Sequence, residues 1–176
     1  MTVVNSRLPR VNSTLNPTVN SALNPLYNSA LNPLYNSTIN PLYNSALNPL
    51  YNSSVNPLYN SAINPLYNSA INPRYNSAIN PRYNSSINPE MTSNIVGLYL
   101  FDWETLGLSG FAVKANGNVY VVFDLQQRLS GIVSRATNTV FVWHDEKGNY
   151  LGQWVFIQEN TFLLYDASTK VVGLTT

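Results

Sequence analysis

The second half of the chain contains acidic side chains and the single histidine, which could act as acids or bases. They recur at intervals of about 21 residues, with the histidine directly before one aspartate: Asp102, Asp124, His144–Asp145 and Asp166. A carboxylate pair could perform general acid–base catalysis, and an imidazole beside a carboxylate could be a base with its orienting partner. A structural interpretation is simpler, because all four aspartates occupy one repeat position and His144 stands where other copies have Phe or Tyr. We therefore expect turn aspartates and no catalytic residue.

Other chemistry is excluded by composition. The 176 residues contain no cysteine and one histidine, so thiolate and His-rich metal sites are ruled out. No phosphate-binding or dinucleotide-binding glycine motif occurs. The sequence predicts a protein that is not an enzyme and has neither a cofactor nor a metal.

The charge pattern also limits the partners. Nine basic and eight acidic residues give a net charge of +1, which argues against nucleic-acid binding. No apolar run is long enough for a membrane-spanning helix. Residues 1–12 lack the apolar core of a secretory signal, which predicts a cytoplasmic protein or one exported by another route.

The four aspartates belong to a repeat that covers residues 98–176. An aromatic residue or His precedes each Asp, and a glycine follows seven or eight residues later: Gly110, Gly131, Gly152 and Gly173. Apolar alternation before each Asp and apolar residues around each Gly indicate strand, turn and strand, four times over. We expect a small antiparallel domain of four β-hairpins, arranged as a meander, a two-sheet sandwich or a small barrel.

Two of these hairpins carry a family resemblance. The segments Phe123-Asp-Leu-Gln-Gln-Arg-Leu129 and His144-Asp-Glu-Lys-Gly-Asn-Tyr-Leu151 resemble the YD (RHS-type) β-hairpin repeat, whose pattern is roughly Tyr-Asp-x-x-Gly-Arg-Leu. One copy keeps the central Gly, and the leading Tyr survives only at Tyr165. The resemblance implies hairpin geometry alone, because four copies cannot build the large β-sheet shell of that family.

The first half of the chain is an octapeptide repeat with the consensus Asn-Pro-x-Tyr-Asn-Ser-x-Leu/Ile. Asn-Pro recurs every eighth residue from Asn16 to Asn88. Proline at this spacing excludes a continuous α-helix, and Asn-Pro and Asn-Ser both favour turns. If every fourth side chain (Tyr, Leu or Ile) points inward, the repeat predicts a narrow β-solenoid, analogous in construction to pentapeptide-repeat solenoids.

The predicted architecture is therefore all-β. Its parts are a lead-in at 1–11, an octapeptide solenoid at 12–91, a linker at 92–97 and the hairpin domain at 98–176. A coil of 16 residues is favoured over one of 8, and the handedness stays open. The alternative for 12–91 is a disordered, turn-rich tract.

The third residue of the Asn-Pro unit varies between Leu, Arg, Glu and Thr, which suggests an outward position. Six leucines would then form a ridge and a candidate interface: Leu26, Leu34, Leu42, Leu50, Leu58 and Leu66. The alternative is that these leucines are core.

Two functions follow from these patterns. The first is a structural protein that associates with itself or forms filaments through the stacked solenoid, with the hairpin domain as cap or decoration. The second is a binding module on a rigid repeat stalk, in which Trp103, Trp143 and Trp154 recognise a glycan or protein. The alternative for these tryptophans is that they fill the core of the sheet.

Overall fold

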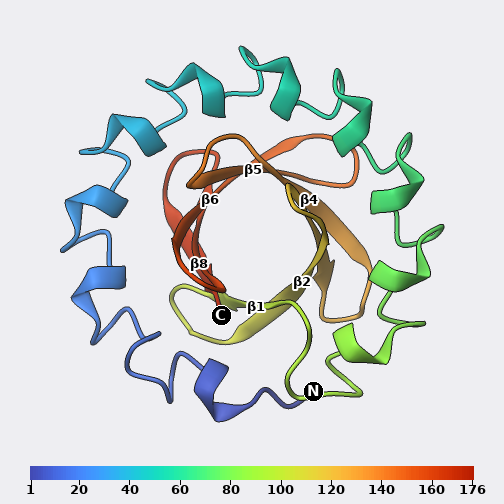
Figure 1. Cartoon of the computed structure of the whole chain (residues 1–176). Helices are drawn as coiled ribbons and strands as arrows, with labels where there is room; N and C mark the ends of the chain where they lie inside the picture. Colours follow the sequence, from blue (N-terminus) through green and yellow to red (C-terminus); the bar gives the residue numbers. More distant parts are fainter.

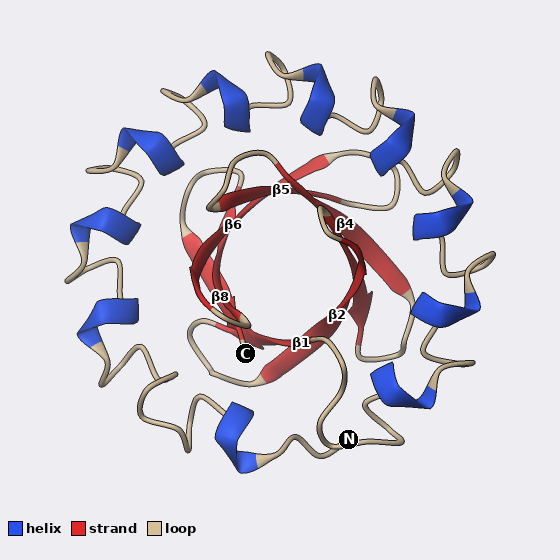
Figure 2. Cartoon of the chain, viewed as in Figure 1, coloured by secondary structure: helices blue, strands red, loops and turns tan.

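The chain forms two concentric layers in a computed structural model that describes all residues 1–176 (Figures 1 and 2). The inner layer is a closed antiparallel barrel in which each strand pairs with its neighbour in sequence and β1 pairs with β8. Its strands are β1 (Leu98–Asp102), β2 (Leu108–Asn116), β3 (Val119–Asp124), β4 (Leu129–Arg135), β5 (Val140–His144), β6 (Tyr150–Gln158), β7 (Thr161–Asp166) and β8 (Val171–Thr175).

The outer layer is a belt of residues 1–97 that encircles the barrel (Figure 1). It consists of turns and short 3-10 helices, each helix taking the Ser-x-Leu/Ile part of one repeat from η2 onward. The helices are η1 (Asn5–Arg7), η2 (Ser21–Leu23), η3 (Ser29–Leu31), η4 (Ser37–Ile39), η5 (Ser45–Leu47), η6 (Ser53–Val55), η7 (Ser61–Ile63), η8 (Ser69–Ile71), η9 (Ser77–Ile79) and η10 (Ser85–Ile87).

Asparagine side chains hold the belt together. The Oδ1 atom of Asn40 accepts a hydrogen bond from the backbone N–H of Leu42 (2.9 Å), which closes a local turn. Its Nδ2 donates to the carbonyl oxygen of Pro33 in the preceding repeat (2.9 Å). Asn44, in the Asn-Ser unit, does the same with the N–H of Ala46 and the carbonyl of Thr38. These bonds recur along the belt and explain why Asn is repeated every fourth residue.

The apolar residues of the belt alternate between its two sides. The buried ones recur every eighth residue: Leu15, Leu23, Leu31, Ile39, Leu47, Val55, Ile63, Ile71, Ile79 and Ile87. The tyrosines between them are exposed, at 77–78% from Tyr27 to Tyr83. The prediction that every fourth side chain points inward is therefore wrong for the tyrosines. Each four-residue unit is a turn rather than a strand; the Asn-Pro unit buries its proline and exposes its tyrosine, whereas the Asn-Ser unit buries its fourth residue.

The predicted β-solenoid is also wrong. The repeats do not stack on one another in coils of 8 or 16 residues; they follow one another in a single layer around the barrel (Figure 2). Self-association or filament formation therefore cannot proceed through stacked solenoid coils and stays a prediction that needs another surface. The all-β class is consistent with the barrel, which is one of the alternatives that the hairpin repeats left open.

The barrel has apolar residues on both faces. One cluster fills the lumen and includes Leu100, Val133, Trp154 and Phe162. The other joins the outer face of the barrel to the buried side of the belt and includes Phe111 and Phe123, which stack at 5.1 Å between ring centroids. The belt thus gives the outer face the cover that an antiparallel sheet ordinarily lacks.

Glycine permits close strand contacts at the repeated position of each hairpin. A Cβ atom on Gly152, which has φ +148°, would lie 1.9 Å from the carbonyl oxygen of Tyr165. At Gly110, Gly131 and Gly173 the corresponding distance to a neighbouring carbonyl oxygen is 2.5–2.6 Å. Each glycine thus lies at a close strand contact, and a register shift accompanies it at each of the four aromatic–Asp positions.

The two ends of the belt meet. The N–H of Val4 donates to the carbonyl of Ser93 (3.0 Å), and the guanidinium of Arg7 donates to the carbonyls of Ile95 (3.0 Å) and Thr176. The guanidinium carbon also lies 4.7 Å from the ring centroid of Tyr99. These contacts close the belt into a ring and tie it to the barrel at β1 and β8.

Candidate functional site

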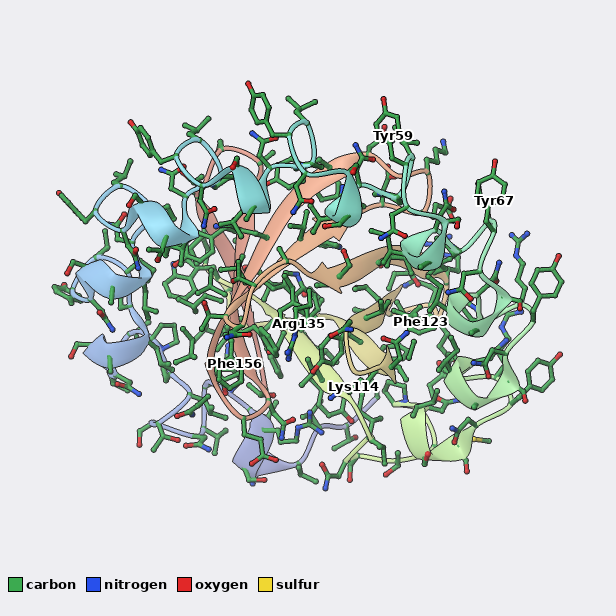
Figure 3. The ribbon with its side chains drawn as sticks, turned by 45° about the horizontal axis from the view of Figure 1, so that its top comes forward. Tyr59, Tyr67, Lys114, Phe123, Arg135 and Phe156 are labelled. Carbon is green, nitrogen blue, oxygen red and sulfur yellow. The ribbon has the colours of Figure 1, made fainter.

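The leucine ridge lies on the exposed side of the belt. Its six side chains are 67–84% exposed, and each is followed by a tyrosine that is 77–78% exposed. We call the residues from Leu26 to Tyr67 at these two positions the Leu–Tyr arc. Figure 3 shows two of its members, Tyr59 and Tyr67, projecting away from the barrel.

The Leu–Tyr arc has the composition of an interface. No charged side chain occurs between Val11 and Ala70, so twelve large exposed apolar or aromatic residues follow one another without a charge among them. Interface centres are depleted of charge and enriched in tyrosine, whereas ordinary surfaces expose apolar residues singly.

The arc is held on a repeated, hydrogen-bonded backbone. The N–H of Leu34 donates to Asn32 Oδ1 (3.0 Å), and that of Leu50 donates to Asn48 Oδ1 (3.0 Å). The N–H of Arg74 donates to Asn72 Oδ1 in the same way (2.9 Å). The backbone of the unit is thus the same whether Leu or Arg follows Asn-Pro.

The four repeated aspartates are turn residues, as expected. Asp124 Oδ1 accepts from the N–H groups of Gln126 and Arg128, both at 2.9 Å. Asp102 accepts from the hydroxyl and the N–H of Thr105, and these bonds hold the pKa of Asp102 below its ordinary value. Partial desolvation raises the pKa of Asp124, but hydrogen bonds from the turn and the ion pair with Arg128 outweigh it and lower the pKa. The aspartates stand in separate hairpins, each engaged with its own turn.

His144 occupies the aromatic position of its hairpin and is buried at 2% exposure. Its ring centroid lies 5.9 Å from that of Tyr150, and its Nε2 has no hydrogen-bond partner. Burial lowers the pKa of His144 from 6.5 to about 4, although the nearby carboxylate of Asp145 opposes the shift. The ring is neutral at physiological pH and fills space, as phenylalanine does at Phe101 and Phe123.

The three tryptophans are not brought together. Trp154 is fully buried in the lumen, and Trp143 packs against it at 6.1 Å between ring centroids. Trp103 is half-buried against the other cluster, on the outer face of the barrel. The structure therefore gives these residues no common surface on which a ligand could rest.

A different aromatic cluster lines a cavity of about 570 Å³ at one end of the barrel. Tyr120, Phe141 and Phe162 lie within 6 Å of one another, and Phe156, 40% exposed, lies 5.5 Å from Phe162. The guanidinium of Arg135 lies 5.2 Å from the ring centroid of Phe141. Figure 3 shows Arg135, Lys114 and Phe156 near this end. The residues of this cluster come from different strands and share no motif, so no sequence pattern reveals them.

No group of three or more His, Cys, Asp or Glu side chains could hold a metal ion, and no helix has the length and apolarity to cross a membrane. Comparisons with protein-family models, with curated proteins and with solved structures found no match.

Proposed function

We propose that this protein is a non-enzymatic structural protein that associates with itself through the Leu–Tyr arc. The observation that carries the proposal is the continuous run of exposed leucines and tyrosines, uncharged over six consecutive repeats. Burial of such a surface is favourable, and its repetition supplies many equivalent anchor points.

A second copy of the chain is the partner that the surface suits best. Two arcs can meet without like-charge repulsion because neither carries a charge, and the net charge of +1 leaves little long-range repulsion between molecules. Symmetric contacts between identical patches are the commonest form of self-association. The contact is side to side, between belts.

Substitution within the arc tests this proposal. Leu34, Leu42 and Leu50 would be changed to Arg together, because Arg74 already occupies the equivalent position on the same backbone. We expect the wild-type protein to show a mass that increases with concentration in sedimentation or light scattering. The triple variant should remain monomeric over the same range.

A matched control adds the same charge elsewhere on the belt. Ala22, Ala30 and Ala62 are exposed at the third position of the Asn-Ser unit, so changing them to Arg adds three charges outside the arc. This control should associate more like the wild type than like the arc variant. A wild-type protein that is monomeric at high concentration, or a control as dissociated as the arc variant, would contradict the proposal.

A second candidate function is ligand binding at the barrel end. The cavity of about 570 Å³ with its aromatic cluster and Arg135 supports it, since aromatic faces suit sugar rings and barrel mouths commonly bind ligands. Titration with neutral and acidic oligosaccharides, followed by NMR, tests it. Binding should perturb resonances of Tyr120 and Phe156 and be lost in Phe156→Ala. Spectra unchanged by every saccharide would remove this candidate.

A further inference from the structure

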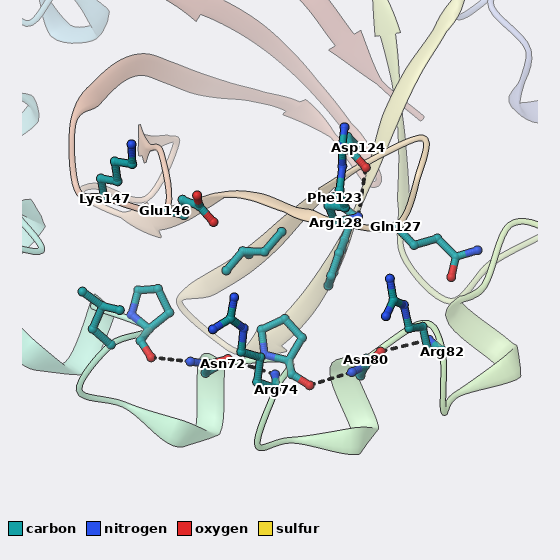
Figure 4. A pocket seen from close by; sticks show the side chains of 14 residues that line it. Asn72, Arg74, Asn80, Arg82, Phe123, Asp124, Gln127, Arg128, Glu146 and Lys147 are labelled. Atoms are coloured by element: carbon teal, nitrogen blue, oxygen red, sulfur yellow. Dashed lines mark hydrogen bonds and ion pairs between the residues drawn. The ribbon is translucent and has the colours of Figure 1, made fainter.

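A second cavity lies between the belt and the barrel, and it is larger than the one at the barrel end. Its volume is about 870 Å³, within the range of small-molecule sites. The belt contributes seven residues between Pro65 and Arg82, and the barrel contributes residues at the ends of β3 and β4 and in the turns after β3 and β5, including Gln127, Arg128 and Lys147 (Figure 4).

Basic side chains dominate the lining. Four are present, Arg74, Arg82, Arg128 and Lys147, against the acidic Asp124 and Glu146. Asp124 is already engaged, since its Oδ2 lies 2.7 Å from Nε of Arg128.

The two belt arginines are free. Neither Arg74 nor Arg82 makes an ion pair or a side-chain hydrogen bond, whereas their backbone N–H groups are fixed by Asn72 and Asn80 at 2.9 Å. Figure 4 shows both side chains extending from the belt into the space below the barrel turn that carries Gln127 and Arg128.

Hydrogen bonds join the belt wall of this cavity to its barrel wall and connect neighbouring repeats within the belt wall. Gln127 Nε2 donates to Asn88 Oδ1 (3.2 Å), which ties the barrel turn to the belt. The Nδ2 atoms of Asn72 and Asn80 donate to the carbonyls of Pro65 and Pro73, both at 2.7 Å. The backbone that carries Arg74 and Arg82 is therefore fixed, while their exposed guanidinium groups stay free to turn toward a ligand.

The repeat sequence changes at the two belt positions that carry the cavity arginines. The third residue of the Asn-Pro unit is Leu in six consecutive repeats and becomes Arg only at positions 74 and 82. Both of these arginines line the cavity. Thr18 and Glu90, at the two ends of the tract, also depart from Leu, but only the two arginines line the cavity.

We infer that this cavity binds a small oxyanionic ligand with at least two negative charges, held by Arg74 and Arg82 and supported by Lys147. Guanidinium groups bind carboxylate, sulfate and phosphate oxygens in a bidentate manner. Pro65 and Pro73 in the lining would contact the apolar part of such a ligand. This inference does not depend on self-association, because both arginines lie outside the Leu–Tyr arc.

Calorimetric titration with citrate, inorganic phosphate and sulfate tests the inference and distinguishes the anion. At about 20 mM salt, where screening is weak, we expect saturable binding of at least one of the three. The variant Arg74→Leu/Arg82→Leu restores the residue that the other repeats carry and should therefore fold. Its affinity for the anion should fall at least tenfold.

The control Arg10→Gln/Lys170→Gln removes two positive charges that line neither this cavity nor the one at the barrel end. Its affinity should stay within about twofold of the wild type, because neither side chain contacts the ligand and only a weak long-range effect is removed. An equal loss in both variants would assign the effect to overall charge and overturn the inference. So would the absence of binding by all three anions, or unchanged binding in Arg74→Leu/Arg82→Leu. Circular dichroism of both variants verifies that they are folded.

Discussion

The guanidinium of Arg7 donates to the carbonyl oxygen of Gly97 at 2.6 Å, and this bond joins the first and last segments of the belt. The same guanidinium also reaches Asn94 Oδ1 at 3.2 Å. One side chain therefore holds a contact between residues that are 90 positions apart in the sequence.

Removing this side chain should open the belt. We expect Arg7→Leu to lower the free energy of unfolding by about 3 kcal/mol, because several charge-assisted bonds are lost and the carbonyls of Ile95 and Gly97 are left without this donor. Arg10→Leu is the matched control, since Arg10 bonds only to the exposed carbonyl of Thr105, and it should cost less than about 1 kcal/mol. Urea unfolding measures both. Equal losses would show that closure by Arg7 is unimportant.

The belt asparagines should differ in importance according to their burial. Asn40 is 2% exposed, so Asn40→Asp should replace its donor to Pro33 by a buried charge and cost about 3 kcal/mol at pH 7. Asn44 is half-buried, and Asn44→Asp should cost about 1 kcal/mol. Thermal unfolding of the two variants provides the comparison. Indistinguishable midpoints would contradict the role assigned to burial.

His144 should make the protein less stable in mild acid. Its pKa is about 4 when folded and 6.5 in the ordinary state, so between these values the unfolded chain binds the proton more readily. Stability should therefore decrease as the pH falls from 6.5 to 4, by up to about 3 kcal/mol.

The variant His144→Phe isolates this effect, because Phe occupies the equivalent position in two other hairpins. The turn aspartates ionise below the same pH window, since their pKa values are lowered from 3.8. In urea unfolding at several pH values, the free energy of unfolding of His144→Phe should not change between about pH 4.5 and about pH 6.5. An equally steep dependence in both proteins would show that another group is responsible.

Gly152 should not tolerate a side chain. Gly152→Ala places a methyl group 1.9 Å from the carbonyl of Tyr165 at a φ of +148°, and we expect a loss of about 3 kcal/mol or more. Gly117→Ala meets no atom within 4 Å and should change stability by less than about 0.5 kcal/mol. Near-ultraviolet circular dichroism and thermal unfolding would reveal the difference. Full stability of Gly152→Ala would refute the close strand contact.

Much of the local structure could be predicted from the sequence. The spacing of Asp and Gly in the second half predicts the hairpins, and Asp124 and Gly152 occupy the turn and close-contact positions that their residue types favour. Proline at every eighth residue excludes a long helix, and the Asn-rich units are turns. These features depend on interactions between residues close in sequence, which local patterns encode.

The arrangement of the two halves could not be predicted in this way. Alternation within a strand would place Tyr43 inward, but the units are turns, and the Asn-Pro unit buries Pro41 instead of Tyr43 while the next unit buries Leu47. Nothing within one octapeptide distinguishes packing against the next coil from packing against a barrel. The strands themselves indicate an outer cover. Val119–Phe123 and Phe162–Tyr165 are apolar or aromatic at every position, which is typical of strands that are buried on both faces of a sheet.

The closed ring has a consequence for the length of the repeat tract. Open arrays can gain or lose a unit at either end, since each unit contacts only its neighbours. Here the circumference of the eight-stranded barrel sets the length that the octapeptides must span. Arg7 can reach the carbonyls of the last belt segment only when the repeat tract has that length. The size of the barrel therefore sets the number of repeats. With one octapeptide more or fewer, the two ends of the belt would not be placed to form the closing contacts of Arg7.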